Sequence, residues 1–327
     1  MKRREFIAGL VGALALPIRV RAQGDLPHVG MLMTPGENEP EARARVAAFR
    51  DSLRKLGWID GQNLRLDLLW GDGDATRIKG FAVDLVMREP RVIVANGTPA
   101  VAALRKATRT IPVVFALVMD PVGLGYIDSF ARPGHNITGF TFIDFSLVGK
   151  WLDLLNNLAP ATNRAGLIYN PETTPYWANY LRSDEATSVS KRTRLIGRPV
   201  RSSAELESAI AEMARAPGGN LMFPPDPFNV VHSERSARRS QELGLPTISV
   251  YRSFAELGGL AAYGPDTADI FRRAASYVNR ILKGEDPSAL PAQNPDKFDF
   301  IINLKTAKAL GLTVPPMLLA ESSEVIE

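Results

Sequence analysis

Short apolar runs that alternate with amphipathic helical segments constrain the fold of this chain more than any other feature. The run at 28–33 (HVGMLM) has the length of a strand, and 40–56 follows it with apolar residues spaced three and four apart. The run at 91–95 (RVIVA) is apolar throughout, as in strands buried on both faces of a parallel sheet. This order predicts the α/β fold class with parallel sheets.

The alternation runs through the chain twice, first over 28–141 and then from 147 onward. A chain of 327 residues is also long enough for two domains of typical size. We therefore expect two Rossmann-like lobes, each built on its own parallel sheet. In such folds a ligand binds beyond the carboxyl ends of the strands.

Residues 1–22 have the pattern of an export signal. Basic residues precede an apolar stretch at 6–17, and small or modest side chains precede a cut after Ala22. The apolar stretch is too short to span a bilayer as a helix, although an uncleaved membrane anchor is the alternative. Arg3-Arg4-Glu5-Phe6-Ile7 is similar to a twin-arginine signal. We expect a soluble protein that is exported to the periplasm and cleaved near Ala22.

Charge and composition exclude several classes of protein. Positions 1–22 hold five basic residues and one acidic residue, which account for the whole net charge of +4. The rest of the chain is close to neutral, so we expect no nucleic-acid partner. The chain has no cysteine and three histidines, and we expect neither a metal nor a cofactor.

Enzyme signatures are missing from the sequence. It contains no G-x-S-x-G elbow and no P-loop, and Asp128 interrupts a dinucleotide fingerprint that would start at Gly123. We therefore predict a binding protein rather than an enzyme. The alternative is a Rossmann-like enzyme that uses Asp120 or Asp226 as a general base.

Polar and proline-containing loops follow the predicted strands and supply the candidate ligand-binding residues. These are Thr34, Asn96, Gly97, Thr98, Pro99, Asp120, Asn170, Asp226 and Tyr263. Ordinary turn and cap chemistry is the alternative for each loop taken alone.

Four of the candidates have a specific expected role. We expect Thr98 to cap a helix that begins at Pro99, and its hydroxyl and the nearby amides to bind a ligand carboxylate. Asp120 and Asp226 would meet a ligand cation from the two lobes. Tyr263 would form an aromatic wall of the site, together with Tyr176, Phe228 and Tyr251. Packing in the core is the alternative for these aromatic residues, above all for Phe228 and Tyr251.

Several segments resemble a known family. The most specific are ARPGHNITG (131–139) and INLKTAKALGL (302–312), and 92–108 and 120–141 also match. The chain resembles substrate-binding proteins of ABC transporters, in the branch that includes tryptophan-binding receptors. Residues 172–200 fit this family loosely, which leaves the ligand open.

The resemblance implies a type I periplasmic binding fold, with two lobes that are joined by three crossovers and close on a ligand. It implies a monomer that captures a small polar or aromatic, amino-acid-like metabolite and delivers it to an ABC permease in the inner membrane. A periplasmic ligand sensor for a signalling partner is the alternative within the same fold.

Local sequence features predict where the chain crosses between the lobes. A strand-to-helix passage at 141–146, a Gly-Gly pair at 258–260 and a proline-rich stretch at 289–295 are the candidate crossings. We therefore expect the first lobe to comprise 23–143 plus 261–288. The second lobe would comprise 144–260 plus 289–327.

Overall fold

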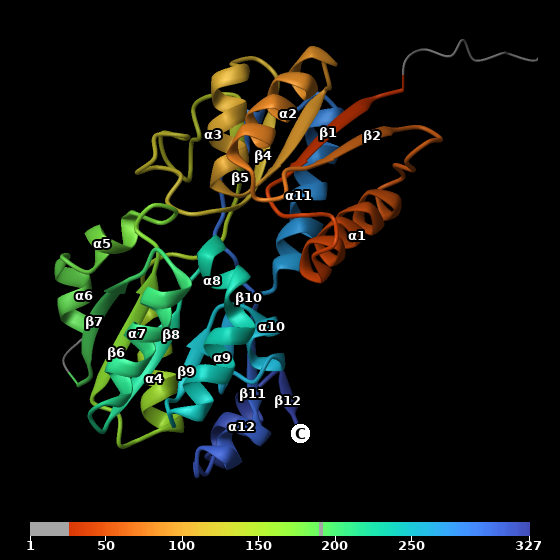
Figure 1. The fold of residues 1–327 in the computed structure, drawn as a ribbon. Helices are drawn as coiled ribbons and strands as arrows, with labels where there is room; N and C mark the ends of the chain where they lie inside the picture. The colour runs from red at the N-terminus through yellow and green to blue at the C-terminus, as the bar shows by residue number, and fades with distance from the viewer. Residues whose placement is uncertain (1–25, 190–191) are drawn as a thin grey trace, which may run out of the picture.

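Two lobes make up the computed structural model, which describes residues 26–189 and 192–327 (Figure 1). The predicted export signal at 1–22 lies outside the described residues. Each lobe holds a central sheet with helices on both faces. None of the described helices is both long enough and apolar enough to cross a membrane.

The first sheet has five parallel strands in the order β2-β1-β3-β4-β5. The strands are β1 (His28–Met33), β2 (Arg65–Trp70), β3 (Val92–Asn96), β4 (Val113–Val118) and β5 (Ile137–Thr141). The helices are α1 (Pro40–Lys55), α2 (Ala75–Met87), α3 (Gly97–Ala107) and α11 (Thr267–Leu282). Helices α1 and α11 share one core with the sheet, and α2 and α3 share another on the opposite face.

The second sheet has seven strands in the order β12-β11-β10-β9-β8-β6-β7. The strands are β6 (Arg164–Tyr169), β7 (Arg194–Pro199), β8 (Gly219–Phe223), β9 (Thr247–Ser249), β10 (Ala261–Pro265), β11 (Phe298–Asn303) and β12 (Glu324–Ile326). Only the pairing of β10 with β11 is antiparallel among these strands. The predicted α/β class, with two sheets dominated by parallel strands, is confirmed.

Helices cover both faces of the second sheet. They are α4 (Leu147–Leu158), α5 (Tyr176–Tyr180), α6 (Asp184–Val189), α7 (Ser203–Ala214), α8 (Pro227–Val231), α9 (Ser233–Glu242), α10 (Arg252–Glu256), α12 (Leu304–Ala309) and α13 (Pro316–Glu321). Trp151 and Trp177 are fully buried in the core on the α4 side, whereas α7 and α9 share the core on the other face.

Two of the expected crossings differ from the structure. Strand β10 pairs with β9 and β11, so 261–265 belongs to the second sheet and the prediction of a crossing at 258–260 is wrong. The chain leaves this sheet only after Pro265. The Gly258-Gly259 pair instead forms a turn, because Gly258 has a φ of 102° and the amide of Gly259 bonds back to Phe254.

The last crossing also begins later than the assigned boundary at 289. A short 3₁₀ helix, η1 (Pro287–Ala289), leads into a segment that stays on the first lobe. There the Thr138 hydroxyl donates to the carbonyl of Leu290, and the amide of Gln293 donates to the carbonyl of Gly139. The chain therefore enters the second sheet between Gln293 and β11.

The carboxyl edges of the two sheets face one another. The chain leaves the first lobe from the carboxyl end of β5 and enters α4 of the second. It returns from the carboxyl end of β10 directly into α11, which packs beside α1 on the first sheet. Both edges are thus joined by short connections, and Figure 1 shows the lobes one above the other with these connections between them.

Two helical stretches of the second lobe are each divided. Helices α5 and α6 are separate, because the hydroxyl of Ser183 donates to the carbonyl of Tyr180 and accepts from the amide of Ala186. Helices α8 and α9 are separated at His232. Strands β7 and β12 lie at the two edges of the second sheet and were not predicted.

Candidate functional site

The loops after β1 and β3 meet at the carboxyl edge of the first sheet. The hydroxyl of Thr34 donates to the backbone carbonyl of Asn96 at 2.5 Å. Gly97 follows with a φ of 82°, and a Cβ atom there would lie 3.3 Å from the Thr34 oxygen. Only a residue without a side chain turns here without strain. The structure thus brings together three of the predicted site residues.

Helix α3 begins earlier than predicted. Its first residue is Gly97, its N-cap is Asn96, and no side chain caps it. The prediction that Thr98 caps a helix starting at Pro99 is therefore wrong, because the left-handed turn at Gly97 starts the helix two residues sooner. Thr98 is half-buried and Pro99 is exposed in the first turn. The amides of that turn have no side-chain acceptor, an arrangement that suits a bound carboxylate.

The end of β4 has an unusual backbone. Leu117 and Asp120 both have positive φ, 61° and 42°, and the strand register shifts between Ala116 and Val118. The carboxylate of Asp120 accepts from the amide of Gly123 at 2.8 Å, and the side chain is exposed. Asp120 therefore fixes the turn at 120–123, and no described residue donates to its second oxygen, which is left for solvent or a ligand.

Asp226 organises the corresponding edge of the second lobe. Its carboxylate accepts from the amide of Asn170 at 2.6 Å and from the amide of Phe228 at 2.9 Å. The hydroxyls of Thr173 and Thr174 also donate to it, at 2.6 and 2.9 Å. The residue is 1% exposed. One carboxylate therefore ties the loop after β6 to the start of α8.

These four hydrogen bonds occupy the carboxylate of Asp226. Its predicted contact with a ligand cation is replaced by a helix-cap and loop-fixing role, because the two oxygens already have four donors within the protein. Asn170 is likewise buried, and its side-chain oxygen accepts from the amide of Glu172. A direct contact with a ligand cation remains a prediction for Asp120.

Two tyrosines lie near Asp226 with partly exposed rings. Burial raises the pKa of Tyr176, and Asp226 and Tyr251 raise it further. Burial also raises the pKa of Tyr251, which Arg45 lowers and Glu41 raises. Arg45 and Glu41 belong to α1 of the first lobe, and Arg45 bonds to Thr267 just after β10, the strand that pairs with β9 ahead of Tyr251. Tyr251 therefore lies on the side of the second lobe that faces α1.

Aromatic residues at the first crossing contact these two tyrosines, and they were not predicted as site residues from the sequence. The ring of Phe142 stacks on Tyr251 with centroids 6.0 Å apart. Phe145 contacts Tyr176, Trp177 and Tyr180 at centroid distances between 4.8 and 6.3 Å. The segment FTFIDF (140–145) holds three phenylalanines at the predicted crossing, which is the signal that could have identified them.

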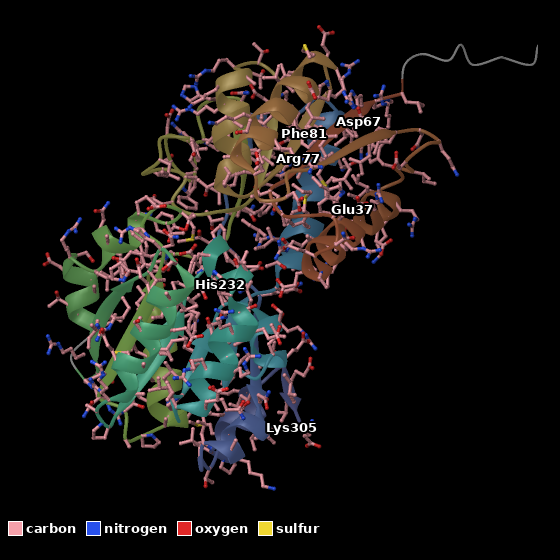
Figure 2. All side chains as sticks on the ribbon, viewed as in Figure 1. Glu37, Asp67, Arg77, Phe81, His232 and Lys305 are labelled. Carbon is pink, nitrogen blue, oxygen red and sulfur yellow. The ribbon has the colours of Figure 1, made fainter. Side chains whose placement is uncertain are left out.

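Two other predicted wall residues lie elsewhere. Tyr263 stacks on Phe298 with centroids 5.6 Å apart, and Lys150 lies over its ring. Phe228 packs against the core between α7 and α9 and contacts His232 at 4.4 Å. His232 is labelled in Figure 2 on the part of the second lobe nearest the first.

A hollow of about 340 Å³ opens at the carboxyl end of β2, beside the strand ends described above. Its lining includes Trp70, Phe81, Arg77 and Glu37. The guanidinium of Arg77 lies 5.3 Å from the centroid of the Phe81 ring (Figure 2). Among the described residues no three histidine or acidic side chains are grouped as a metal site would require.

Comparison with known proteins identifies the family. The model for ABC transporter substrate binding proteins matches residues 38–326. The chain belongs to this family. A tyrosine-binding protein of Clostridioides difficile (strain R20291) is 26% identical over 266 residues, which cover 81% of this chain and 75% of that protein.

Solved structures share the fold over nearly the whole chain. A conserved domain protein from Vibrio cholerae is 28% identical, with a TM-score of 0.81 over 91% of this chain and 99% of that one. An ABC domain from Streptococcus pneumoniae in complex with L-Trp is 23% identical, with a TM-score of 0.82 over 92% and 100% of the two chains. The predicted type I periplasmic binding fold is confirmed.

Family membership settles the general role of the chain. It is an extracytoplasmic substrate-binding protein of an ABC transporter, so its partners are a small-molecule ligand and a permease. The family and the similar structures consist of binding proteins. The prediction of a solute receptor is confirmed.

Proposed function

We propose that this receptor captures an aromatic amino acid between the carboxyl edges of its two sheets and delivers it to its permease. The pair of half-buried tyrosines, Tyr176 and Tyr251, carries the proposal, because their rings contact Phe145 and Phe142 at the first crossing between the lobes. Two similar proteins are described as tyrosine-binding and as an L-Trp complex, which supports the same ligand class.

The ends of the ligand have separate partners in this proposal. The α-carboxylate binds the uncapped first turn of α3, where Thr98 adds a hydroxyl and Thr34 and Asn96 fix the turn. The ammonium group pairs with the open oxygen of Asp120. Asn170 and Asp226 act indirectly, since their hydrogen bonds hold the loop that precedes Tyr176.

The same proposal includes binding without catalysis. The enzyme alternative needs a carboxylate that is free to take a proton from a substrate. Asp226 has four donors, and Asp120 accepts from a backbone amide. The four donors to Asp226 leave it no oxygen for a general base, and we assign the remaining oxygen of Asp120 to the ligand ammonium.

Export and assembly are further parts of the proposal. Arg3 and Arg4 in a twin-arginine pattern favour export to the periplasm, with cleavage near Ala22. We propose that the mature protein is a monomer, since each lobe already surrounds its own cores.

Calorimetric titration of the mature protein tests the ligand class. L-Trp, L-Tyr and L-Phe should bind, whereas L-Leu and L-Asp should bind roughly 2- to 13-fold more weakly, because an aromatic pair adds about 0.5–1.5 kcal/mol beyond its buried area. Tyr176→Leu should weaken binding of L-Trp by about 10-fold, and Phe81→Leu should not. Tight binding of a non-aromatic amino acid, with no response to the aromatic ones, would contradict the proposal.

A further inference from the structure

An ion pair on α1, formed by a buried arginine and a partly buried glutamate, reaches the start of α11. Arg45 is 7% exposed, and its guanidinium donates to Glu41 at 3.0 Å and to the hydroxyl of Thr267 at 3.1 Å. Thr267 is the first residue of α11, directly after the crossing from β10. Arg45 therefore holds Glu41 next to the connection between β10 and α11, which joins the two lobes.

The carboxylate of Glu41 is only half satisfied. Its Oε2 atom accepts from Arg45, whereas its Oε1 atom is buried and accepts no hydrogen bond from any described residue. A buried acceptor on a charged group is costly to leave unpaired. The ion pair thus presents an oxygen that needs a donor, at the edge of the first lobe.

A donor of the right kind faces it from the second lobe. The hydroxyl of Tyr251 makes no hydrogen bond within the described part of the chain, and its pKa responds to Glu41, Glu39, Arg45 and Asp226. The ring is held by stacking on Phe142 of the first crossing. Tyr251 follows β9, which pairs in parallel with β10, and Thr267 just after β10 bonds to Arg45, the partner of Glu41. Tyr251 therefore lies on the side of the second lobe that faces Glu41, and among the described residues Phe142 is its only ring partner.

We propose that the hydroxyl of Tyr251 donates to Oε1 of Glu41 when the lobes close, and that this interlobe bond sets how readily the closed state forms. The inference deepens the proposed function, since closure is the step that retains the ligand. The bond stabilises only the closed state, so it raises ligand affinity without a contact to the ligand. Arg45 is the residue that positions the acceptor.

A double-mutant cycle tests the bond. Tyr251→Phe and Glu41→Gln should each raise the Kd for L-Trp by about 10-fold or more, the usual effect of losing a hydrogen bond to a charged group. The double variant should bind L-Trp no more weakly than the weaker-binding single variant, because both substitutions remove the same hydrogen bond. Tyr126→Phe and Glu234→Gln are the matched controls and should leave the Kd unchanged.

A ligand analogue separates the bond from a direct contact. Indole-3-propionate lacks the ammonium group of L-Trp, and the two single substitutions should weaken its binding by the same factor. Additive losses in the cycle, or an effect of Glu41→Gln that disappears with this analogue, would assign Glu41 to the ligand ammonium and overturn the proposal. Equal melting temperatures of the ligand-free variants would show that folding is intact.

Interlobe distances provide a readout that does not depend on the ligand class. The chain has no cysteine, so Met87→Cys on α2 and Met317→Cys on α13 give a unique pair of exposed labelling sites on the two lobes. Tyr251→Phe and Glu41→Gln should shift the measured spin-label distances toward the more separated state. If no aromatic amino acid binds the wild type, the proposed ligand class fails, and unchanged distances in the ligand-free variants would overturn the interlobe bond separately.

Discussion

The carboxylate of Asp226 accepts a hydrogen bond from the backbone amide of Asn170, a residue that precedes it by 56 positions. With the hydroxyls of Thr173 and Thr174 it forms a buried cluster at the carboxyl edge of the second sheet. Asp226→Ala should lower the free energy of unfolding by about 3 kcal/mol, because buried donors lose a charged acceptor. Urea unfolding measures the loss.

Two further variants define the cause of that loss. Asp226→Asn keeps the shape of the side chain and one acceptor oxygen, and should lose less than Asp226→Ala. Asp128→Ala removes a carboxylate whose side chain is 66% exposed, and should change stability by less than about 0.5 kcal/mol. Equal stabilities of all three variants would argue against the cluster as a stabilising element.

Thr98→Val tests the carboxylate site at the start of α3. The substitution keeps the shape of the side chain and removes its hydroxyl, so the Kd for an amino-acid ligand should rise by roughly 10- to 100-fold. Thr110→Val, at an exposed threonine beyond the other end of α3, should have no effect on binding. A similar Kd for the wild type and Thr98→Val would remove Thr98 from the site.

Acid stability should depend on Asp67, which bonds to Arg65 and Arg88 and lies 3.1 Å from His28. Burial acts to raise the pKa of Asp67, but these basic partners outweigh it and lower the pKa to about 2. The folded state therefore releases this proton more readily than the unfolded state, and the stabilisation is complete above about pH 5. It is lost as the pH falls toward 2.

Asp67→Asn should remove that part of the pH dependence. Unfolding free energies of the wild type should fall by on the order of 1 kcal/mol more than those of the variant between pH 5 and pH 2. Asp51→Asn, at an exposed ion pair on α1, serves as the control. Parallel curves for the wild type and Asp67→Asn would contradict the assignment.

Export should require both arginines of the leader. The double substitution Arg3→Lys and Arg4→Lys keeps the charge of the n-region and should leave the full-length precursor in the cytoplasm. Fractionation followed by mass measurement of the mature chain reads both location and cleavage. Equal periplasmic yields would indicate the general secretory route instead.

Much of the fold follows from local pattern. The strand predicted at 28–33 has those bounds in the structure, and the apolar run at 91–95 is the fully buried β3 with a shift of one residue. Periodicity and burial act locally here, since each strand in a parallel sheet needs apolar side chains on both faces. The order of strands and helices was enough to predict two lobes.

What could not be predicted depends on distant partners. Residues 261–265 belong to the second sheet because they pair with β9 and β11. The sequence of this segment alone does not indicate which strands it pairs with. Likewise, Asp226 and Asp120 are each followed by a proline, yet Asp226 is buried with four donors and Asp120 is exposed. Their surroundings come from chain segments far apart in sequence.

The late position of α11 has a consequence for synthesis. A ribosome that has made β5 has released the whole first sheet, but the helix that packs beside α1 ends at Leu282, about 140 residues later. At roughly 5–20 residues per second this delay is on the order of 10–30 s. During that interval the apolar face of the first sheet that α11 will cover, including Val94 and Phe140, lacks its final partner. The native core on this face can therefore form only after most of the second lobe has been translated.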